Sequence, residues 1–198
     1  MLDPGTLRGS LMRPRELQPY VADEGWFRFN PQGIHGAPHT TRVLVWSEAI
    51  ADLLGRPGAV RREELRWAAA VHDVGRVDDG IDRGHGGRSA AWVRERLVTE
   101  RPLASGLDLD VVAELCRWHE VRDQDIPGLT LELLILKDAD ALDRARLRDL
   151  DPGRLRLASS LGLVDAAARL ERATDRYGEV TPEEVLHAAE RLFGGTLT

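Results

Sequence analysis

Apolar residues recur along this chain at helical spacing, and hardly any stretch shows the alternation that is typical of a strand. The clearest stripe runs from Leu65 to Ala69, and His72 continues it where a core residue would be expected. Asp73 follows directly, and Gly75 suits the left-handed residue that ends many helices. The pattern therefore predicts a helix that ends in a buried histidine and an aspartate, where a site can open.

The same periodicity predicts helices on both sides of this one. Pro38 suits the first turn of one helix, and the apolar residues of 90–98 mark another. Asp108 or Asp110 caps a further helix, because a side-chain oxygen there can accept the first free backbone N–H groups. The apolar stripe of that helix leads to His119.

The carboxyl-terminal half continues in the same way. The segment 131–136 is apolar all round, as in a helix that is buried on most sides. Pro152 opens a stretch of Ala, Leu and Arg that predicts one long helix, and Thr181 begins a capping box for the last helix. The sequence therefore predicts an all-α, single-domain helical bundle over 33–198, with 1–32 as an N-terminal extension packed on it.

Composition narrows the class of protein. A chain of 198 residues with 42% hydrophobic and 30% charged residues suits one soluble domain. The net charge of -6 argues against general nucleic-acid binding, which needs a basic surface. The single cysteine, Cys116, fits a reducing compartment, and no apolar run is long enough for a signal peptide or a bilayer span. We therefore expect a cytoplasmic protein with no membrane partner.

Other histidines also stand where predicted helices begin or end. His39 lies in the first turn of its helix with Arg42 one turn further on, so their side chains point the same way. An imidazole beside a guanidinium suits an anion or a metal-bound phosphate between them. His119 repeats the pattern of His72, and the glycines around His85 let the backbone approach a ligand closely there.

The candidate chemistry is that of a metal ion. Adjacent His72 and Asp73 at a buried helix end can ligate a hard or borderline metal, although a core histidine beside a solvated aspartate is the simpler interpretation of the pair alone. A second acidic motif follows the 131–136 segment. Asp138 and Asp140 lie two positions apart and face away from each other on a helix, so only one of them can enter a given site.

The order of these residues resembles the HD domain superfamily of metal-dependent phosphohydrolases. The resemblance covers roughly 33–147 and rests on His-Thr-Thr-Arg-Val, His-Asp-Val-Gly-Arg and Lys-Asp-Ala-Asp-Ala-Leu-Asp. It implies an HD-type bundle with the metal site in its core and the ligands His39, His72, Asp73 and Asp140. It selects Asp140 over Asp138 and makes Asp143 a partner for Arg42 or for a ligating histidine.

The resemblance extends to superfamily members with two metals. It implies that His85 and His119 are further ligands in this chain and that Asp73 bridges the ions. We expect one or two divalent transition ions, namely Fe, Mn, Co, Ni or Zn, since imidazole and carboxylate together suit these metals. A single tight ion with a weaker second position is favoured, because His85 follows Asp73 by only twelve positions. Alternatively, both histidines bind substrate phosphate by hydrogen bonds.

The resemblance implies a phosphatase or phosphodiesterase that acts on a nucleotide or another small phosphoester through a metal-activated water. Asp73 would take part directly, and Arg42 and Lys137 would supply positive charge at the site. Arg76 would add to that charge, although a role in surface solubility is more plausible for Arg76 than for Arg42 or Lys137. The segment His-Gly-Ala-Pro-His also resembles the start of the HD-like phosphodiesterase domain of bacterial SidE effectors, which implies that His35 is a general acid or a spectator.

Two other functions fit the same residues. A few HD proteins with six ligands use two irons to activate dioxygen, so a di-iron HD-type oxygenase is the first alternative. A non-catalytic nucleotide-binding module is the second. The complete set of ligand residues argues against such a module, which has no need of every ligand.

Overall fold

The computed structural model describes residues 13–55, 58–174 and 180–193, and within them every regular element is a helix. The α-helices are α2 (Ala37–Leu53), α3 (Arg62–Val71), α4 (His85–Glu100), α5 (Leu109–Trp118), α6 (Leu131–Asp143), α7 (Ala158–Leu161), α8 (Val164–Thr174) and α9 (Pro182–Phe193). Short 3₁₀ helices accompany them: η1 (Pro14–Tyr20), η2 (Glu24–Trp26), η3 (Pro102–Gly106), η4 (Asp123–Asp125), η5 (Arg144–Leu147) and η6 (Pro152–Arg154). None of these helices has the length and apolar character that a membrane crossing requires. The predicted all-α fold is confirmed.

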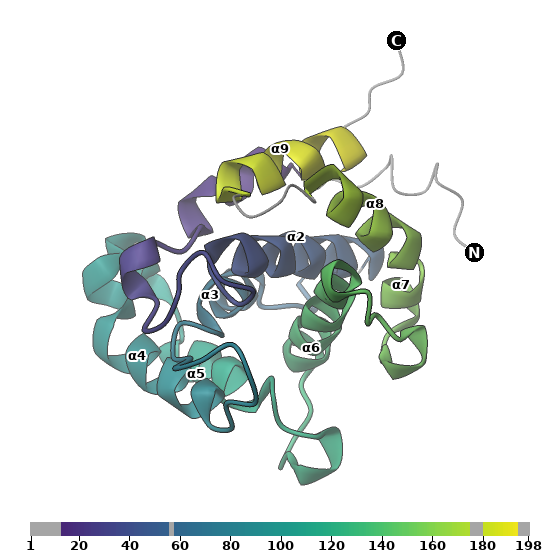
Figure 1. Cartoon of the computed structure of the whole chain (residues 1–198). Helices are drawn as coiled ribbons and strands as arrows, with labels where there is room; N and C mark the ends of the chain where they lie inside the picture. The colour runs from purple at the N-terminus through teal and green to yellow at the C-terminus, as the bar shows by residue number, and fades with distance from the viewer. Residues whose placement is uncertain (1–12, 56–57, 175–179, 194–198) are drawn as a thin grey trace.

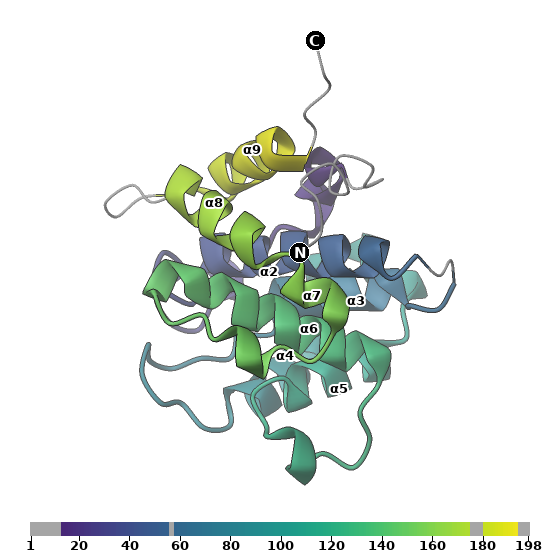
Figure 2. The same ribbon diagram turned by 90° about the vertical axis from the view of Figure 1, so that its right-hand side faces the viewer.

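Helix α2 is the central element, with α8 and α9 above it and α3, α4 and α5 below it in the orientation of Figure 1. The view in Figure 2 keeps this arrangement, and in both views α6 also lies below α2. Every residue from Ala37 to Ala51 is buried, as expected for a helix that other helices cover on all sides. Gly36 caps the start of α2, and Pro38 lies in its first turn. Because the helix is buried from this turn onward, the polar side chains of His39 and Arg42 lie in the interior.

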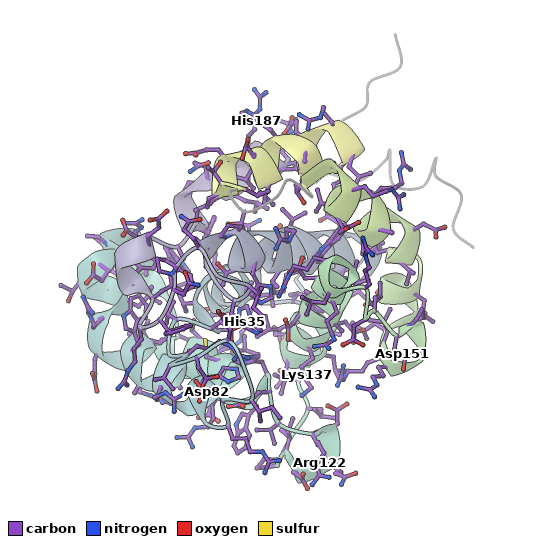
Figure 3. The ribbon with its side chains drawn as sticks, in the orientation of Figure 1. His35, Asp82, Arg122, Lys137, Asp151 and His187 are labelled. Carbon is purple, nitrogen blue, oxygen red and sulfur yellow. The ribbon has the colours of Figure 1, made fainter. Side chains whose placement is uncertain are left out.

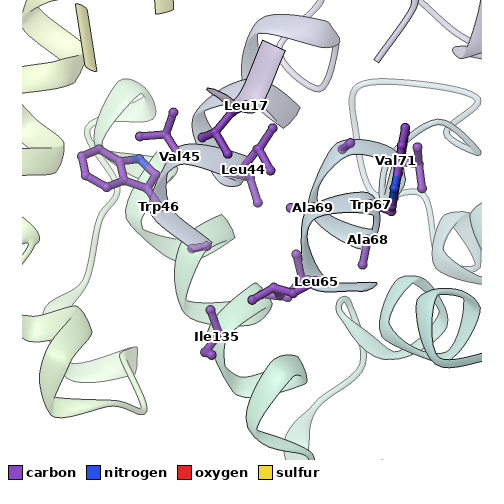
Figure 4. Packing of buried hydrophobic residues seen from close by; sticks show 14 of the residues in the cluster. Leu17, Leu44, Val45, Trp46, Leu65, Trp67, Ala68, Ala69, Val71 and Ile135 are labelled. Atoms are coloured by element: carbon purple, nitrogen blue, oxygen red, sulfur yellow. The ribbon is translucent and has the colours of Figure 1, made fainter. Parts of the chain in front are cut away.

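Large apolar side chains of α2, α3 and α6 form the centre of the core (Figure 4). Trp46 of α2, Leu65 of α3 and Ile135 of α6 are almost fully buried. Each such side chain contributes roughly 2 kcal/mol through the apolar surface that it removes from water. Ala68 and Ala69 of α3 are also fully buried, and their small size lets α2 and α3 approach closely.

The described part of the N-terminal extension packs on the bundle. Leu17 of η1 and Trp26 of η2 are buried, and η1 contacts α9. The indole N–H of Trp26 donates to Glu100 at 3.2 Å, and its ring lies 5.2 Å from the ring of Trp92. Residues 1–12 lie outside the described residues, and the domain boundary after residue 32 stays a prediction.

Two predicted helix starts are confirmed by their capping contacts. The side chain of Asp108, rather than Asp110, accepts the backbone N–H of Val111 at the start of α5. Thr181 and Glu184 exchange hydrogen bonds of 3.0 and 3.2 Å before α9, which is the predicted capping box. Caps are local interactions, so these starts follow from neighbouring residues alone.

The expected conformation of Gly75 after α3 is wrong. Gly75 does not have a positive φ. A Cβ atom at this position would lie 2.5 Å from the backbone nitrogen of Ser89 and 2.8 Å from the carbonyl oxygen of His85. Glycine is therefore required because the start of α4 packs directly against this turn.

The single helix expected after Pro152 is also wrong, since the chain forms η6, α7 and α8 there. The buried carboxylate of Asp138 explains one of the breaks. It accepts the backbone N–H groups of Arg156 and Leu157, each at 2.9 Å. This contact holds the segment between η6 and α7 in extended form, so the helix cannot run through it.

Candidate metal centre

Five helices bring the predicted ligands together in the core of the bundle. His39 comes from α2 and Asp140 from α6, whereas His72 and Asp73 follow α3, His85 begins α4 and His119 follows α5. The four histidines and Asp73 are buried, and the Asp140 side chain is 38% exposed. Figure 3 shows His35 near the middle of the molecule, on the loop that precedes α2. The cluster is therefore closed on most sides and reaches solvent at Asp140.

One half of the cluster is the first position, formed by His39, His72, Asp73 Oδ2 and Asp140. The Nε2 atoms of His39 and His72 lie 3.3 Å apart. His39 Nε2 is 3.6 Å from Asp73 Oδ2 and 3.5 Å from Asp140 Oδ1, and His72 Nε2 is 3.8 Å from Asp73 Oδ2. Two imidazole nitrogens therefore lie close to each other and to two carboxylate oxygens.

The other half is the second position, formed by His85, His119 and Asp73 Oδ1. The two Nε2 atoms lie 3.0 Å apart. Their distances from Asp73 Oδ1 are 3.1 Å for His85 and 3.5 Å for His119. The loop after Asp73 is thus long enough to return His85 to the aspartate, contrary to the expectation drawn from the short spacing.

The four imidazoles present their Nε2 atoms to the centre because acceptors hold their Nδ1 atoms. The Nδ1 atom of His72 lies 2.9 Å from the carbonyl oxygen of Ala69. The Nδ1 atoms of His85 and His119 lie 2.6 Å from the Asp82 carbonyl and 2.7 Å from the Cys116 carbonyl, respectively. A protonated Nδ1 leaves a lone pair on Nε2. Lone pairs that face each other at 3.0 to 3.3 Å repel, so each pair requires a proton or a metal cation between its members.

Asp73 has the properties of a shared ligand. Burial acts to raise its pKa, but His72 and the other surrounding histidines hold the pKa of Asp73 well below the ordinary value. Oδ1 is buried and makes no hydrogen bond, although two histidine nitrogens are close to it. A buried anionic oxygen without a donor is costly, and a cation in the second position would remove that cost.

Asp143 is the predicted partner of Arg42 and of a ligating histidine, and the contacts confirm it. His39 Nδ1 lies 2.7 Å from Asp143 Oδ2, and Arg42 Nε donates to Asp143 Oδ1 at 2.6 Å. Although burial acts to raise the pKa of Asp143, Arg42 and His39 keep it far below the ordinary value. The anion between His39 and Arg42 is therefore a carboxylate of the protein itself, which orients His39 for a metal.

The positive groups expected at the site lie at different distances from the cluster. Arg76 Nε donates to Asp73 Oδ2 at 3.1 Å, so Arg76 contacts a candidate ligand directly. Lys137 donates to the backbone carbonyls of Trp118, His119 and Val121 at the end of α5. It also lies 3.2 Å from Asp123. Lys137 therefore stabilises the C-terminus of α5, and no contact described for it reaches a ligand side chain.

His35 lies at the entrance to the cluster. Its Nδ1 is 2.9 Å from Asp73 Oδ2, and its side chain is 19% exposed. Burial lowers the pKa of His35 more than the nearby Asp73 raises it. His35 therefore contacts Asp73 directly and remains accessible to a substrate.

Two residues near the site were missed by the sequence analysis. Arg146 Nε donates to Asp143 Oδ2 at 2.6 Å, and Glu120 Oε2 lies 3.3 Å from His85 Nδ1. The spacing of three residues between Asp143 and Arg146 on a helical stretch was the available signal for the first. Outside the site, His187 lies on the outer side of α9 in Figure 3, and Cys116 is a buried free thiol.

These contacts define a class of protein, namely an all-helical domain whose core gathers donor atoms that could hold a metal ion. Among the described residues, three groups could each hold a metal ion, because the ligand atoms within each group lie within 4.8 Å of one another. The groups are His35/His39/Asp73, His39/His72/Asp140 and His72/Asp73/His119. A family model for the HD domain matches residues 36–145, which is more than half of the chain. The protein therefore belongs to the HD domain superfamily of metal-dependent phosphohydrolases. No curated protein and no solved structure matches the chain significantly.

Proposed function

We propose that this protein is a phosphatase or phosphodiesterase that uses one or two divalent transition ions to hydrolyse a small phosphoester, with a nucleotide as the first candidate. The observation that carries the proposal is the position of Asp73. One of its oxygens faces His39 and His72, and the other faces His85 and His119. Two sets of nitrogen donors on one carboxylate fit ions such as Fe, Mn, Co, Ni or Zn.

Bound at these positions, a divalent metal supplies Lewis-acid chemistry, which lowers the pKa of a coordinated water and neutralises charge on a phosphoryl oxygen. The residues of this chain then have separate tasks. Asp143 and Arg42 orient His39, and Arg76 places a guanidinium against Asp73 beside the entrance. Arg42 acts through His39 and not through contact with the substrate.

His35 is proposed to protonate the oxygen of the leaving group. It lies at the entrance with Nδ1 held near Asp73, which leaves its Nε2 for a substrate. His35→Gln should lower kcat by about tenfold or more. The metal content should stay unchanged, since His35 belongs to neither of the two positions proposed for the ions. An unchanged kcat would assign His35 the role of a spectator.

The proposed function is tested by metal analysis together with a panel of phosphate monoesters and diesters. His72→Ala and Asp73→Ala should each abolish bound metal and hydrolysis, because a compact site loses most of its affinity with one ligand. Full metal content in Asp73→Ala would overturn the assignment of this centre. Failure of the metal-loaded protein on every phosphoester would overturn the proposed reaction.

A di-iron oxygenase is the alternative that the second position favours, because it provides a second set of ligands on Asp73. Visible absorption and Mössbauer spectra of protein purified without added metal separate the two activities. A bound nucleotide without turnover would instead indicate a binding module. We further propose a cytoplasmic location, which is supported by the single buried thiol of Cys116.

A further inference from the structure

Glu120 joins the start of α4 to the end of α5 at the outer side of the second position. Its Oε1 accepts the backbone N–H groups of Gly84 and Gly86, both at 3.0 Å. These two glycines flank His85, and Glu120 itself follows His119. One oxygen of Glu120 thus holds the backbone on both sides of His85, and Glu120 is itself the residue next to His119.

The second oxygen of Glu120 faces the imidazole of His85. Oε2 lies 3.3 Å from His85 Nδ1, which also points to the Asp82 carbonyl at 2.6 Å. A negative charge behind Nδ1 favours the tautomer that leaves the Nε2 lone pair free and makes that nitrogen a stronger donor to a metal. The Glu120 side chain is only 19% exposed, so water screens this interaction weakly.

The backbone contact between α4 and α5 makes this arrangement possible. A Cβ atom on Gly86 would lie 2.6 Å from the carbonyl oxygen of Cys116 and 2.8 Å from that of Arg117. Without that side chain, the first turn of α4 lies against the last turn of α5. The Glu120 carboxylate then reaches the free N–H groups of the α4 N-terminus, where a negative charge is favoured.

We propose that Glu120 is the positioning residue of the second metal position, holding His85 and His119 at one spacing and setting the donor strength of His85. The proposal rests on the metal centre of the proposed function. It assigns Glu120 to the second position alone, because no contact described for Glu120 reaches His39, His72 or Asp140. Loss of the Glu120 carboxylate should therefore weaken one ion and spare the other.

The test is a titration of metal-free protein with Co²⁺, followed by calorimetry and by the visible absorption of the bound ion. The wild-type chain should bind two ions in separable phases. In Glu120→Gln the amide oxygen can still accept the glycine N–H groups, but the charge behind His85 is lost. The second position has three donor side chains against four in the first, so it should be the weaker phase. That phase should lose about 10- to 100-fold in affinity, whereas the tighter phase changes less than about twofold.

Glu120→Ala removes both functions and should abolish the weaker phase. Glu95→Gln, which changes an exposed carboxylate on α4, is the matched control and should titrate like the wild type. Far-UV circular dichroism of the metal-free variants tests folding, and Glu120→Gln decides the question if Glu120→Ala does not fold. Two unchanged phases, an equal loss in both phases, or a single phase in the wild type would each overturn the proposal. An absence of phosphoester hydrolysis would leave the titration result intact, so the two failures are distinguishable.

Discussion

Asp138 and Asp140 are neighbours in sequence on α6, yet their carboxylates serve different parts of the molecule. Asp140 Oδ1 lies 3.5 Å from His39 Nε2. Asp138 is fully buried and accepts backbone N–H groups of Arg156 and Leu157. One carboxylate is thus placed for a metal and the other holds a chain segment.

This difference predicts opposite effects of two similar substitutions. Asp140→Ala should remove most of the bound metal and change the stability of the metal-free protein little. Asp138→Ala should keep the metal but lower the free energy of unfolding by about 2 kcal/mol, because two partly buried N–H groups lose their acceptor. Metal content and urea unfolding of metal-free protein measure both effects. Equal metal loss in the two variants would mean that the faces of α6 have been assigned wrongly.

The candidate site could be predicted from the sequence only where a residue's neighbours carry the signal. His72 ends an apolar stripe, and His39 and Asp140 lie in short motifs whose order resembles a known family. The part played by Lys137 could not be predicted, because its partners are carbonyl groups at the end of another helix. Glu120 was missed for the same reason, since its partner Gly84 is 36 positions away.

At the scale of helices, Gly86 and Gly87 stand side by side at the start of α4 but in different surroundings. A Cβ atom at Gly86 would meet two backbone carbonyls of α5, whereas a Cβ atom at Gly87 would have nothing within 4 Å. The first glycine is needed for the contact between the helices. The second only raises the cost of ordering the chain.

Alanine at these two positions should therefore change stability in opposite directions. Gly86→Ala is expected to lower the free energy of unfolding by about 2 kcal/mol, because α4 and α5 must move apart. Gly87→Ala should raise it by roughly 0.5 kcal/mol through better helix propensity. Urea unfolding of both metal-free variants checks the signs, and a shared loss would contradict the contact described for Gly86.

The sequence predicted helices better than it predicted their packing. The capped starts of α5 and α9 depend on residues within one turn, so local rules were sufficient. The contacts that require Gly75 to lack a side chain lie on α4, and the break before α7 depends on Asp138. Interactions between distant segments leave no periodic signal, which explains these errors.

The contacts of Asp123 with Arg156 and Lys137 predict that the stability of the protein depends on pH. Hydrogen bonds from Arg156, and then from Lys137, lower the pKa of Asp123 below its ordinary value of 3.8. The unfolded chain therefore binds a proton at Asp123 at higher pH than the folded chain does. The resulting stabilisation is fully present above 3.8 and is lost as the pH falls through the lower pKa of the folded state.

Asp123→Asn should lack this contribution at every pH. The Tm difference between the wild-type protein and this variant should be greatest near neutral pH and shrink progressively below about pH 4. Thermal unfolding of metal-free protein across this range measures the difference. Asp125→Asn, at an exposed neighbour, controls for the change in net charge, and a Tm difference that grows in acid would refute the ion pairs proposed for Asp123.

At the scale of the whole molecule, the metal centre is also where the bundle is joined. Its side chains come from or directly follow α2, α3, α4, α5 and α6, and the contact between His39 and Asp143 spans 104 positions. The unfolded chain cannot hold these groups together, so metal binding favours the folded state. Stability of the entire domain should therefore depend on the metal.

This coupling gives the last prediction. At a free metal concentration about 100 times the Kd, binding adds about 2.7 kcal/mol to the free energy of unfolding. For a domain of this size, that change should raise the Tm by roughly 5–10 °C. The measurement compares chelated wild-type protein with and without added Mn²⁺ or Zn²⁺. Asp73→Ala should show no rise, since it loses the carboxylate shared by both positions. A ligand that binds only the folded state must stabilise that state. A wild-type Tm that does not change when metal is added would therefore contradict a metal site formed by folding.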